Sequence, residues 1–486
     1  MLSTILIFLC FSIIFWWKKR KVRHTRQPPV HPGVLPLIGH LHLIMGNYKR
    51  MWRVLKKIAH ECIELGHATT LHFGSRCYYV ITDPDDCLTV ANSCLQKDTI
   101  YEFSKPLFGE GLITAPVHIW KEHRKLLNPT FNLKFLNGFL YVFNKHGKEL
   151  VREIEIESKY GPFNPEPYLK QNEMKNIYIT ALGLDFSKYK VFQEKYENTL
   201  ESILKIYIER LQKFWLHYEF IWNRSNLKKK HDKYVKTLHD MMHWIIQEKR
   251  QINNCYISKD WSFTPFVDIF FDFKRKTSNI FSDTAIRDHM NTLMAAGHDT
   301  ISVALSYIFL MIGSYQNVQD RIYRELLEVF DNMERDVEKE DLIKLIYLDA
   351  VIKETMRIYP IVPMIGRYID KDIKLKHYTL LAGNSCALMI YGIHRNPIWG
   401  SDADQFKPDR WLDSSSLPQN SYRFLPFSLG KRICIGKSYA MMSLKVTLVY
   451  ILRNYRIAGD HTKLKNKLGI LLRPDSGHFI SITPRK

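Results

Sequence analysis

The chain has 486 residues, of which 46% are hydrophobic and 24% charged, and this composition excludes an intrinsically disordered protein. Its 70 Lys and Arg residues outnumber its 49 Asp and Glu residues, and the net charge of +21 favours an anionic partner such as a membrane or an acidic protein. The basic residues lack regularly interleaved aromatics, so no nucleic-acid site is predicted. The eight cysteines contain no Cys-x-x-Cys pair, which argues against a zinc site or a disulfide framework.

Residues 1–17 are predicted to form a membrane anchor. No charged residue occurs from Leu2 to Trp17, and this run is followed at once by the basic sequence KKRKVR. Interfacial tryptophans and a basic flank are typical of the cytosolic end of a membrane-spanning helix. A cleaved signal peptide would carry positive charge before its apolar run, so cleavage is not expected. The rest of the chain is therefore expected to face the cytosol.

Residues 18–33 are predicted to be a basic and proline-rich linker. The sequence QPPVHPGVLPLIGH, residues 27–40, contains four prolines, three of them within the linker, and prolines cannot continue the preceding helix. Beyond the linker, residues 34–486 show helical periodicity over most of their length, with short β-branched or aromatic runs such as residues 72–83. We therefore expect a mainly α domain with a smaller β portion.

A long helix is predicted to begin at Ser282, a suitable N-cap, and its middle carries the sequence AAGHDT. Ala296 and Gly297 would leave space beside a flat cofactor, and Asp299 next to Thr300 could relay protons. The Thr300 hydroxyl can also bond back to the Ala296 carbonyl and open the helix locally. Taken alone, the motif is equally compatible with a helix-packing glycine that has polar neighbours.

The sequence KETMRIYP places Glu354 and Arg357 on one face of a helix that ends before Pro360. A pair with this spacing is commonly exposed to solvent. Further along the chain, FKPDRW offers Arg410 as a third charged partner.

The sequence FSLGKRICIG places Cys434 between two glycines. Gly430 and Gly436 would allow a tight turn, and Arg432 could pair with an anionic group. The following sequence predicts a helix whose amino end lies at the cysteine, where the helix dipole lowers the pKa of a thiol. A cysteine in an apolar segment is commonly a small buried residue, but the glycines and the arginine favour a thiolate that binds iron.

The spacing F-x-x-G-x-R-x-C-x-G, from Phe427 to Gly436, resembles the haem-binding loop of the cytochrome P-450 family of haem-thiolate monooxygenases. AGHDT is similar to the oxygen-activation motif of this family, and KETMRIYP and FKPDRW are similar to its E-x-x-R helix and its downstream arginine motif. The resemblance implies a single large haem domain over residues 34–486, with Cys434 as the axial ligand of the haem iron.

The resemblance also implies roles for residues that are far apart in the chain. Asp299 and Thr300 would deliver protons on the distal side of the haem. The residues Glu354, Arg357 and Arg410 would form a buried structural triad that takes no part in the chemistry. The expected haem-binding residues are Trp120, Arg124, Ala296, Gly297, Arg367, Phe427, Gly430, Arg432, Cys434 and Gly436.

Within the family, the sequence looks closest to the animal microsomal branch that contains the fatty-acid omega-hydroxylases, and in particular to its insect members. GLITAP, residues 111–116, and AGHDT carry this likeness. In several omega-hydroxylases a glutamate just before G-H-D-T forms an ester with the haem, and Ala296 holds that position here. We therefore expect heme b that is not covalently attached, and strict omega specificity is not supported.

The activity implied by the resemblance is insertion of one oxygen atom from O2 into a lipophilic substrate such as a fatty acid, hormone, pheromone or xenobiotic. Because no flavin or nicotinamide fold is evident, the electrons would come from an NADPH-dependent reductase, with cytochrome b5 as a further candidate donor. The expected location is the endoplasmic reticulum membrane. A basic docking face for the reductase would consist of Lys121, Arg124, Lys125, Lys431 and Lys437.

Two other functions are left open by the sequence. One is a haem-thiolate isomerase or dehydratase that needs no external electrons, which the Asp299 and Thr300 pair disfavours. The other is a non-catalytic, membrane-tethered basic binding protein. His239 and His243 have the spacing of two ligands in the H-E-x-x-H zinc motif, but no third ligand is evident, so zinc is not expected.

Overall fold

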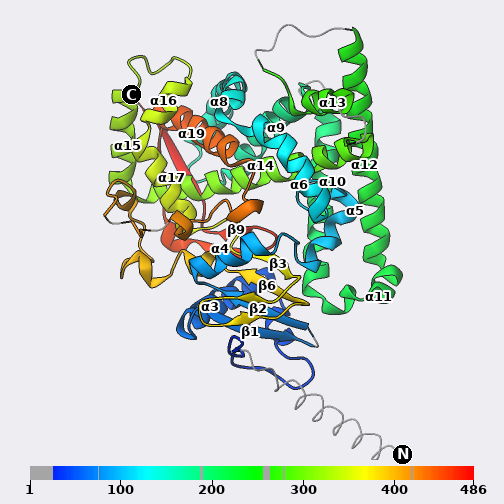
Figure 1. The fold of residues 1–486 in the computed structure, drawn as a ribbon. Coiled ribbons are helices and arrows are strands. Elements are labelled where there is room, and N and C mark those ends of the chain that lie inside the picture. The colour runs from blue at the N-terminus through cyan, green and yellow to red at the C-terminus, as the bar shows by residue number, and fades with distance from the viewer. Residues whose placement is uncertain are drawn as a thin grey trace, which may run out of the picture.

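The computed structural model describes residues 26–485, apart from residue 75 and residues 186–189, 256–262, 277–279, 416 and 420. The predicted membrane anchor and the start of the predicted linker lie outside the described residues. Helices dominate the described part of the chain and strands form a smaller portion, which confirms the predicted fold class. The largest sheet lies at one end of the molecule and most of the helices lie beyond it (Figure 1).

The largest sheet has four strands in the order β1-β2-β6-β3. β1 (Ala68–Phe73) and β2 (Arg76–Ile81) form an antiparallel hairpin, while β6 (Asn384–Leu388) runs parallel to β2 and antiparallel to β3 (Ile365–Ile369). The sheet therefore joins the first and last thirds of the chain, and β3 carries Arg367 into the interior.

Part of the predicted linker is bound to this sheet. Val30 forms a parallel bridge with Thr70 of β1. The hydroxyl groups of Thr69 and Thr70 donate to the carbonyls of Pro29 and Pro28, each at 3.0 Å. The described end of the linker therefore belongs structurally to the domain, because its prolines leave carbonyl groups free to accept these bonds.

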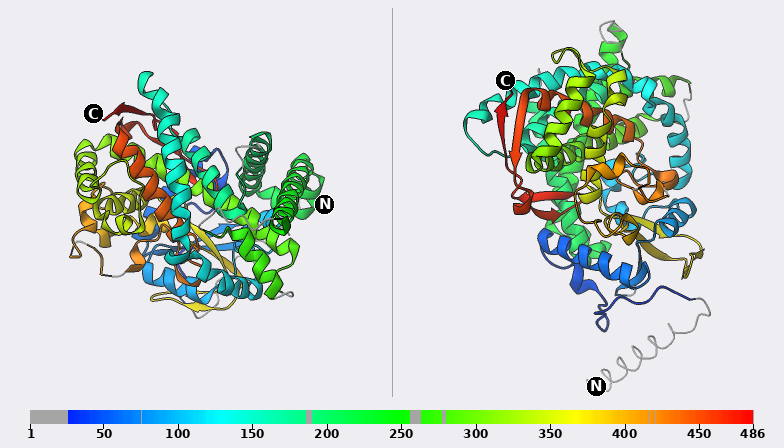
Figure 2. Two further views of the ribbon diagram at one scale, coloured as in Figure 1. Left: turned by 90° about the horizontal axis from the view of Figure 1, so that it is seen from above. Right: turned by 90° about the vertical axis from the view of Figure 1, so that its left-hand side faces the viewer.

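Three two-stranded sheets and many helices complete the fold, and the β7 and β10 pair lies along one edge of the helical part (Figure 2). The remaining strands are β4 (Ile373–Lys374), β5 (Thr379–Leu380), β7 (Tyr455–Gly459), β8 (Lys465–Leu468), β9 (Leu472–Ser476) and β10 (Ile480–Pro484). The longer helices are α3 (Tyr48–Glu64), α4 (Pro84–Ser93), α6 (Val117–Leu127), α8 (Leu140–Ile154), α9 (Glu166–Ile177), α10 (Lys190–Gln212), α12 (Asn226–Cys255), α13 (Phe266–Lys276), α14 (Asp283–Ser314), α15 (Gln316–Val329), α17 (Ile346–Ile358) and α19 (Lys437–Asn454). The shorter α-helices are α2 (Leu41–Ile44), α5 (Lys105–Phe108), α7 (Leu133–Leu136), α11 (Glu219–Arg224), α16 (Lys339–Lys344) and α18 (Ile390–Ile393).

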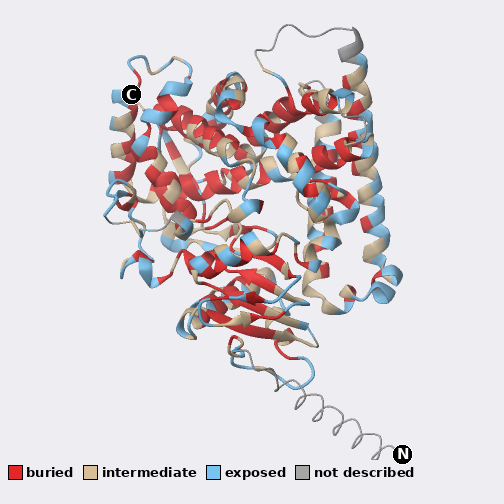
Figure 3. Ribbon diagram, in the orientation of Figure 1, coloured by how far each residue is buried: buried red, intermediate tan, exposed pale blue. Residues whose placement is uncertain are grey.

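Helix α14 is the central element of the core (Figure 3). The hydroxyl of Ser282 accepts a hydrogen bond from the Ala285 amide at 3.0 Å, so the predicted N-cap is confirmed. Every residue from Ile301 to Gly313 is buried, which is typical of a helix packed on all sides. Among the described residues, α14 is the one helix long and apolar enough to cross a membrane, and its burial in the core accounts for that composition.

Candidate active site

Cys434 lies in the loop between the short 3-10 helix η11 (Gly430–Arg432) and α19. The Cys434 amide donates a hydrogen bond to the Phe427 carbonyl at 2.9 Å and closes the loop. Gly430 has a φ of 67°, and a Cβ atom at this position would lie only 2.8 Å from a side-chain oxygen of α4. Both the backbone conformation and the close approach therefore require glycine at position 430, as predicted.

Gly436 has a different role from Gly430. It is the N-cap of α19 and has an ordinary φ of −81°. Among the described residues, the one atom within 4 Å of a Cβ placed at position 436 would be the Cys434 sulfur, at 3.9 Å. Gly436 lies in the turn that precedes α19, and its backbone approaches the Cys434 sulfur, as predicted, although its φ does not itself require glycine.

The Cys434 thiol is accessible although protein atoms surround it. The residue is exposed to solvent, yet burial raises the pKa of its thiol. The Gly436 amide and the cations Arg124 and Lys97 act in the opposite direction but do not outweigh burial. The amide at the helix end lowers this pKa, as predicted, but burial outweighs it, and a bound metal ion would make the thiolate the stable form.

Four predicted haem-binding residues from three segments meet beside this loop. The guanidinium carbon of Arg432 lies 4.1 Å from the centroid of the buried Trp120 ring on α6. Arg124, one turn further along α6, donates from Nη1 to the Ile433 carbonyl at 2.8 Å. Arg367 of β3 is fully buried and lowers the pKa of Arg432 through their mutual repulsion.

The positive charges in this cluster are not balanced by the protein. Burial, together with the charges of Arg367 and Arg124, lowers the pKa of Arg432 to about 9. The Nε and Nη2 atoms of Arg367 are buried and find no hydrogen-bond partner among the described residues. Buried guanidinium groups are stable only when they are paired, so the cluster has the properties of a site for an anionic ligand.

The turn after α5 fixes the position of Arg432. A Cβ atom at Gly111 would lie 2.1 Å from Thr292 Oγ1 of α14, and the Glu110 amide donates to the Asp288 carboxylate at 3.0 Å. This close packing places the carbonyls of Leu112 and Ala115 where Arg432 donates to both, each at 3.3 Å. The GLITAP sequence therefore links α14 to the loop of Cys434.

The AGHDT residues of α14 point to different neighbours. Ala296 is exposed in the middle of the largely buried helix α14, and the Thr300 hydroxyl donates to its carbonyl at 2.8 Å, as predicted. Asp299 is buried and forms an ion pair with Arg473. A Cβ at Gly297 would lie 2.7 Å from Ile177 Cδ1 of α9. Gly297 therefore makes room for a neighbouring helix, which differs from the predicted role of making room for a cofactor.

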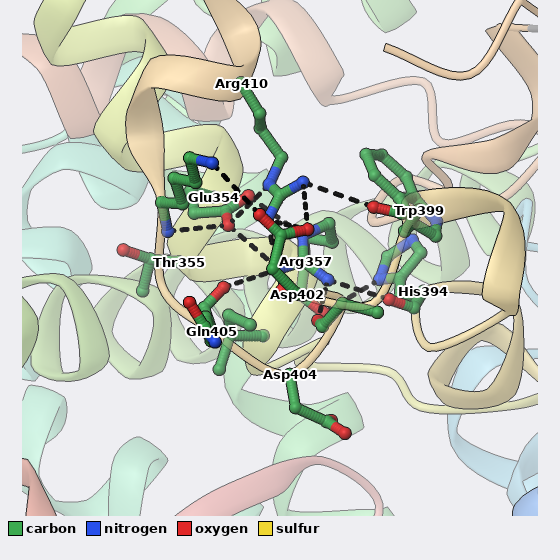
Figure 4. A network of polar contacts seen from close by, with 12 residues as sticks. Glu354, Thr355, Arg357, His394, Trp399, Asp402, Asp404, Gln405 and Arg410 are labelled. Carbon is green, nitrogen blue, oxygen red and sulfur yellow. Dashed lines mark hydrogen bonds and ion pairs between the residues drawn. The ribbon is translucent and has the colours of Figure 1, made fainter. Parts of the chain in front are cut away.

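Glu354 of α17 binds two arginines in the interior (Figure 4). Arg357 donates from Nε to Oε2 at 2.9 Å and from Nη2 to Oε1 at 2.8 Å, and Arg410 donates from Nε to Oε1 at 2.9 Å. Burial raises the pKa of Glu354, but Arg357 and Arg410 more than compensate and hold it below the usual value. The three residues are thus brought together as an ionised, buried network.

This network fixes the backbone between α18 and the Cys434 loop. Arg357 donates to the carbonyls of His394, at 2.9 Å, and Gln405, at 3.0 Å, and Arg410 donates to the Asp402 carbonyl at 3.2 Å. Removing one partner would leave a buried charge uncompensated, which typically costs about 3–5 kcal/mol.

The comparison with known families agrees with this geometry. A family model described as "Cytochrome P450" matches residues 28–481. The chain belongs to the cytochrome P450 family. Membership makes it a haem-dependent monooxygenase whose family uses O2, lipophilic substrates and redox partners.

Relatives of this cytochrome P450 come from insects and mammals, which confirms the predicted animal branch. Cytochrome P450 4c3 of Drosophila melanogaster is 29% identical, and the match covers 99% of this chain and 95% of the relative. Cytochrome P450 4V2 of Mus musculus is 28% identical, with 99% and 94% covered. Cytochrome P450 4c21 of Blattella germanica is 29% identical, with 93% and 92% covered.

The residues of this cytochrome P450 fit heme b. The open sulfur of Cys434 is a suitable iron ligand, and the unpaired nitrogens of Arg367 beside Arg432 and Arg124 suit two propionate groups. The haem of most family members is not covalently bound. Ala296 has no carboxyl group, so it cannot form an ester with the cofactor.

Three residues that position the site were not found from the sequence. Lys97 pairs with Arg367 in an isolated β-bridge, and burial next to Arg367 and Arg432 lowers its pKa. Asp288 holds the turn before GLITAP, and Arg473 binds Asp299. Only the Gly-x-Gly sequence at 109–111 could have indicated close packing of that turn, because the other contacts join distant segments.

Proposed function

We propose that this cytochrome P450 inserts one oxygen atom from O2 into a fatty acid, hormone, pheromone or xenobiotic, with electrons from an NADPH-dependent reductase. The observation that carries the proposal is the exposed Cys434 thiol two residues from Arg432, whose charge is repelled by the buried Arg367 with its two unpaired nitrogens. This arrangement supports a thiolate-bound haem with paired propionates. Oxygen insertion is the activity of the family to which the chain belongs.

Haem binding and proton delivery are assigned to different residues. When bound, heme b supplies O2 activation at a thiolate-ligated iron. Cys434 holds the iron, and Arg367 and Arg432 neutralise the propionates. The Thr300 hydroxyl, which donates to the Ala296 carbonyl, would also hold a water molecule beside α14. Asp299 would exchange protons with that water.

Replacement of Cys434 by serine tests the iron ligand. The C434S variant should lose the Soret band that is typical of a thiolate-bound ferrous haem with carbon monoxide, because a serine hydroxyl is a poor substitute for a thiolate. C77S, in which a half-buried cysteine of β2 is replaced, is the matched control and should keep the band. Retention of the band in folded, haem-loaded C434S would contradict the assignment.

Replacement of Thr300 by alanine tests the proton-delivery role. T300A should keep the Soret band but divert electrons to peroxide and lower product formation, on the order of tenfold, because the hydroxyl that holds the water is gone. Product and peroxide are measured against NADPH consumed. Turnover that persists without NADPH and reductase would instead support the isomerase or dehydratase alternative.

We further propose that the enzyme is anchored in the endoplasmic reticulum membrane by residues 1–17, with its domain in the cytosol. The uncharged run that ends before KKRKVR supports this. Cytochrome b5 is a second candidate electron donor. Membrane retention after alkaline extraction should be lost when residues 1–17 are deleted, and continued integral association of the truncated enzyme would contradict the anchor.

A further inference from the structure

Arg473 of β9 connects two carboxylates that lie on different helices. It donates from Nη1 to Glu166 Oε1 of α9 at 2.9 Å and from Nη2 to Asp299 Oδ2 of α14. The second oxygen of Asp299 is buried and has no hydrogen-bond partner within the described part of the chain. One oxygen of Asp299 is thus held by Arg473, whereas the other is buried and unpaired.

Arg473 is the main charge that offsets the burial of Asp299. Its side chain is only 8% exposed, whereas that of Glu166 is 22% exposed. Burial raises the pKa of Asp299, but attraction to Arg473, with smaller help from nearby charges, brings it below the usual value. Burial also lowers the pKa of the adjacent His298, which is therefore neutral near pH 7. Among the described residues, the other titratable groups that face this pair are Lys170 of α9, Glu201 of α10 and Tyr307 of α14.

We infer that Arg473 is a positioning residue for proton delivery: it keeps Asp299 charged and aligned, so that the free carboxylate oxygen can accept a proton. This inference rests on the proposed role of Asp299. Glu166 completes the arrangement, because it keeps the guanidinium paired when Asp299 takes up a proton. Without Glu166, each protonation of Asp299 would leave Arg473 as an unpaired, largely buried cation.

The ionisation of Asp299 can be measured without turnover. Infrared spectra of the ferric, haem-loaded enzyme are recorded between about pH 6 and pH 8, a range in which an ordinary carboxylic acid is ionised. Asp299 should be ionised in the wild type and in R473K. Adding D299N to either should therefore remove no band of a protonated carboxyl group. R473M should show one, because burial of Asp299 is then opposed only by the weaker effects of other nearby charges. R473Q serves the same purpose if R473M does not bind haem.

The matched control is a second aspartate of α14 that is paired with an arginine from another helix. Arg250 and Lys274 bind Asp283 at the start of α14, and these partners hold the pKa of Asp283 at about 2. The Asp283 side chain is 45% exposed, so R250M should produce no protonated carboxyl band. Absence of the band in R473M or R473Q, or its presence in R473K, would overturn the inference.

Coupling measurements separate this inference from the proposed function. R473M should form several-fold more peroxide per NADPH than the wild type, R473K should restore coupling, and E166Q should raise peroxide without producing the carboxyl band. A band in R473M with unchanged coupling would show that Arg473 controls the charge of Asp299 but that Asp299 is not the proton relay. Unchanged coupling in E166Q would contradict the part assigned to Glu166.

Discussion

Single buried charges in this cytochrome P450 are stable only where a partner compensates for burial, and Glu173 shows what happens without one. This carboxyl group of α9 is 1% exposed and accepts hydrogen bonds from Ser443 at 2.7 Å, Asn172 at 3.1 Å and Asn176 at 3.3 Å. Burial raises its pKa to about 7, since these neutral donors only partly oppose burial. Glu354, which has two arginines, shifts in the opposite direction.

Glu173 predicts a specific dependence of stability on pH. The unfolded carboxyl releases its proton near pH 4.5 and the folded one near pH 7, so the folded state binds more protons between these values. Stability should therefore fall as the pH rises through this interval and stay lower above it, by about 3 kcal/mol. E173Q should remove this decrease and be more stable than the wild type at neutral pH.

The measurement is unfolding of the haem-loaded enzyme by urea at several pH values, followed by circular dichroism. E328Q, which changes an exposed glutamate on α15, is the control and should follow the wild-type curve. A uniform loss of stability in E173Q at every pH would show instead that the ionised carboxylate is the stabilising form.

At the scale of elements, the sequence predicted the structure best where the backbone conformation depends only on residues that are close in the chain. Ser282 caps α14 because a hydroxyl before an apolar helix accepts a hydrogen bond from a backbone amide. Gly430 adopts a positive φ, which residues with a side chain disfavour. Gly297 could not be assigned in the same way, because its role depends on which helix packs against it. The partner of Asp299 was equally hidden, since Arg473 lies on a distant strand.

The turn before α6 packs closely on α14 at Gly111, and this contact can be tested. A Cβ atom in G111A would lie 2.1 Å from Thr292 Oγ1 and 2.8 Å from the Asp288 carbonyl, so the turn must move away from α14. This shift would displace the carbonyls of Leu112 and Ala115 from Arg432. G111A should therefore lose about 1–3 kcal/mol of stability and bind less haem.

Haem content per folded protein and the midpoint of urea unfolding check this prediction. G161A is the control, because a Cβ at that position meets no described atom within 4 Å, although its φ of 87° strains the backbone. G161A should therefore lose some stability but keep its haem. Full haem content in G111A would show that the turn does not position Arg432.

At the scale of the whole molecule, the net charge is +21, and one group of exposed basic residues adjoins the Cys434 loop. Arg124 of α6 binds the Ile433 carbonyl and thereby joins α6 to this loop. The exposed lysines on the joined elements are Lys121, Lys125, Lys431 and Lys437. A second basic cluster lies on α12 and includes the exposed Lys229 and Lys230. This separation allows the proposed docking face to be tested against an equally basic surface.

Charge reversal at Lys431 and Lys125 should weaken the proposed interaction with the reductase. The double variant K125E/K431E should raise the KM for reductase several-fold and reduce the dependence of the rate on salt, because electrostatic attraction steers an acidic partner. K229E/K230E on α12 is the matched control, with the same change in net charge. Turnover supported by an organic peroxide, which bypasses the reductase, should be unchanged in both variants. Equal effects of the two variants on KM would show that overall charge, and not this face, governs the encounter.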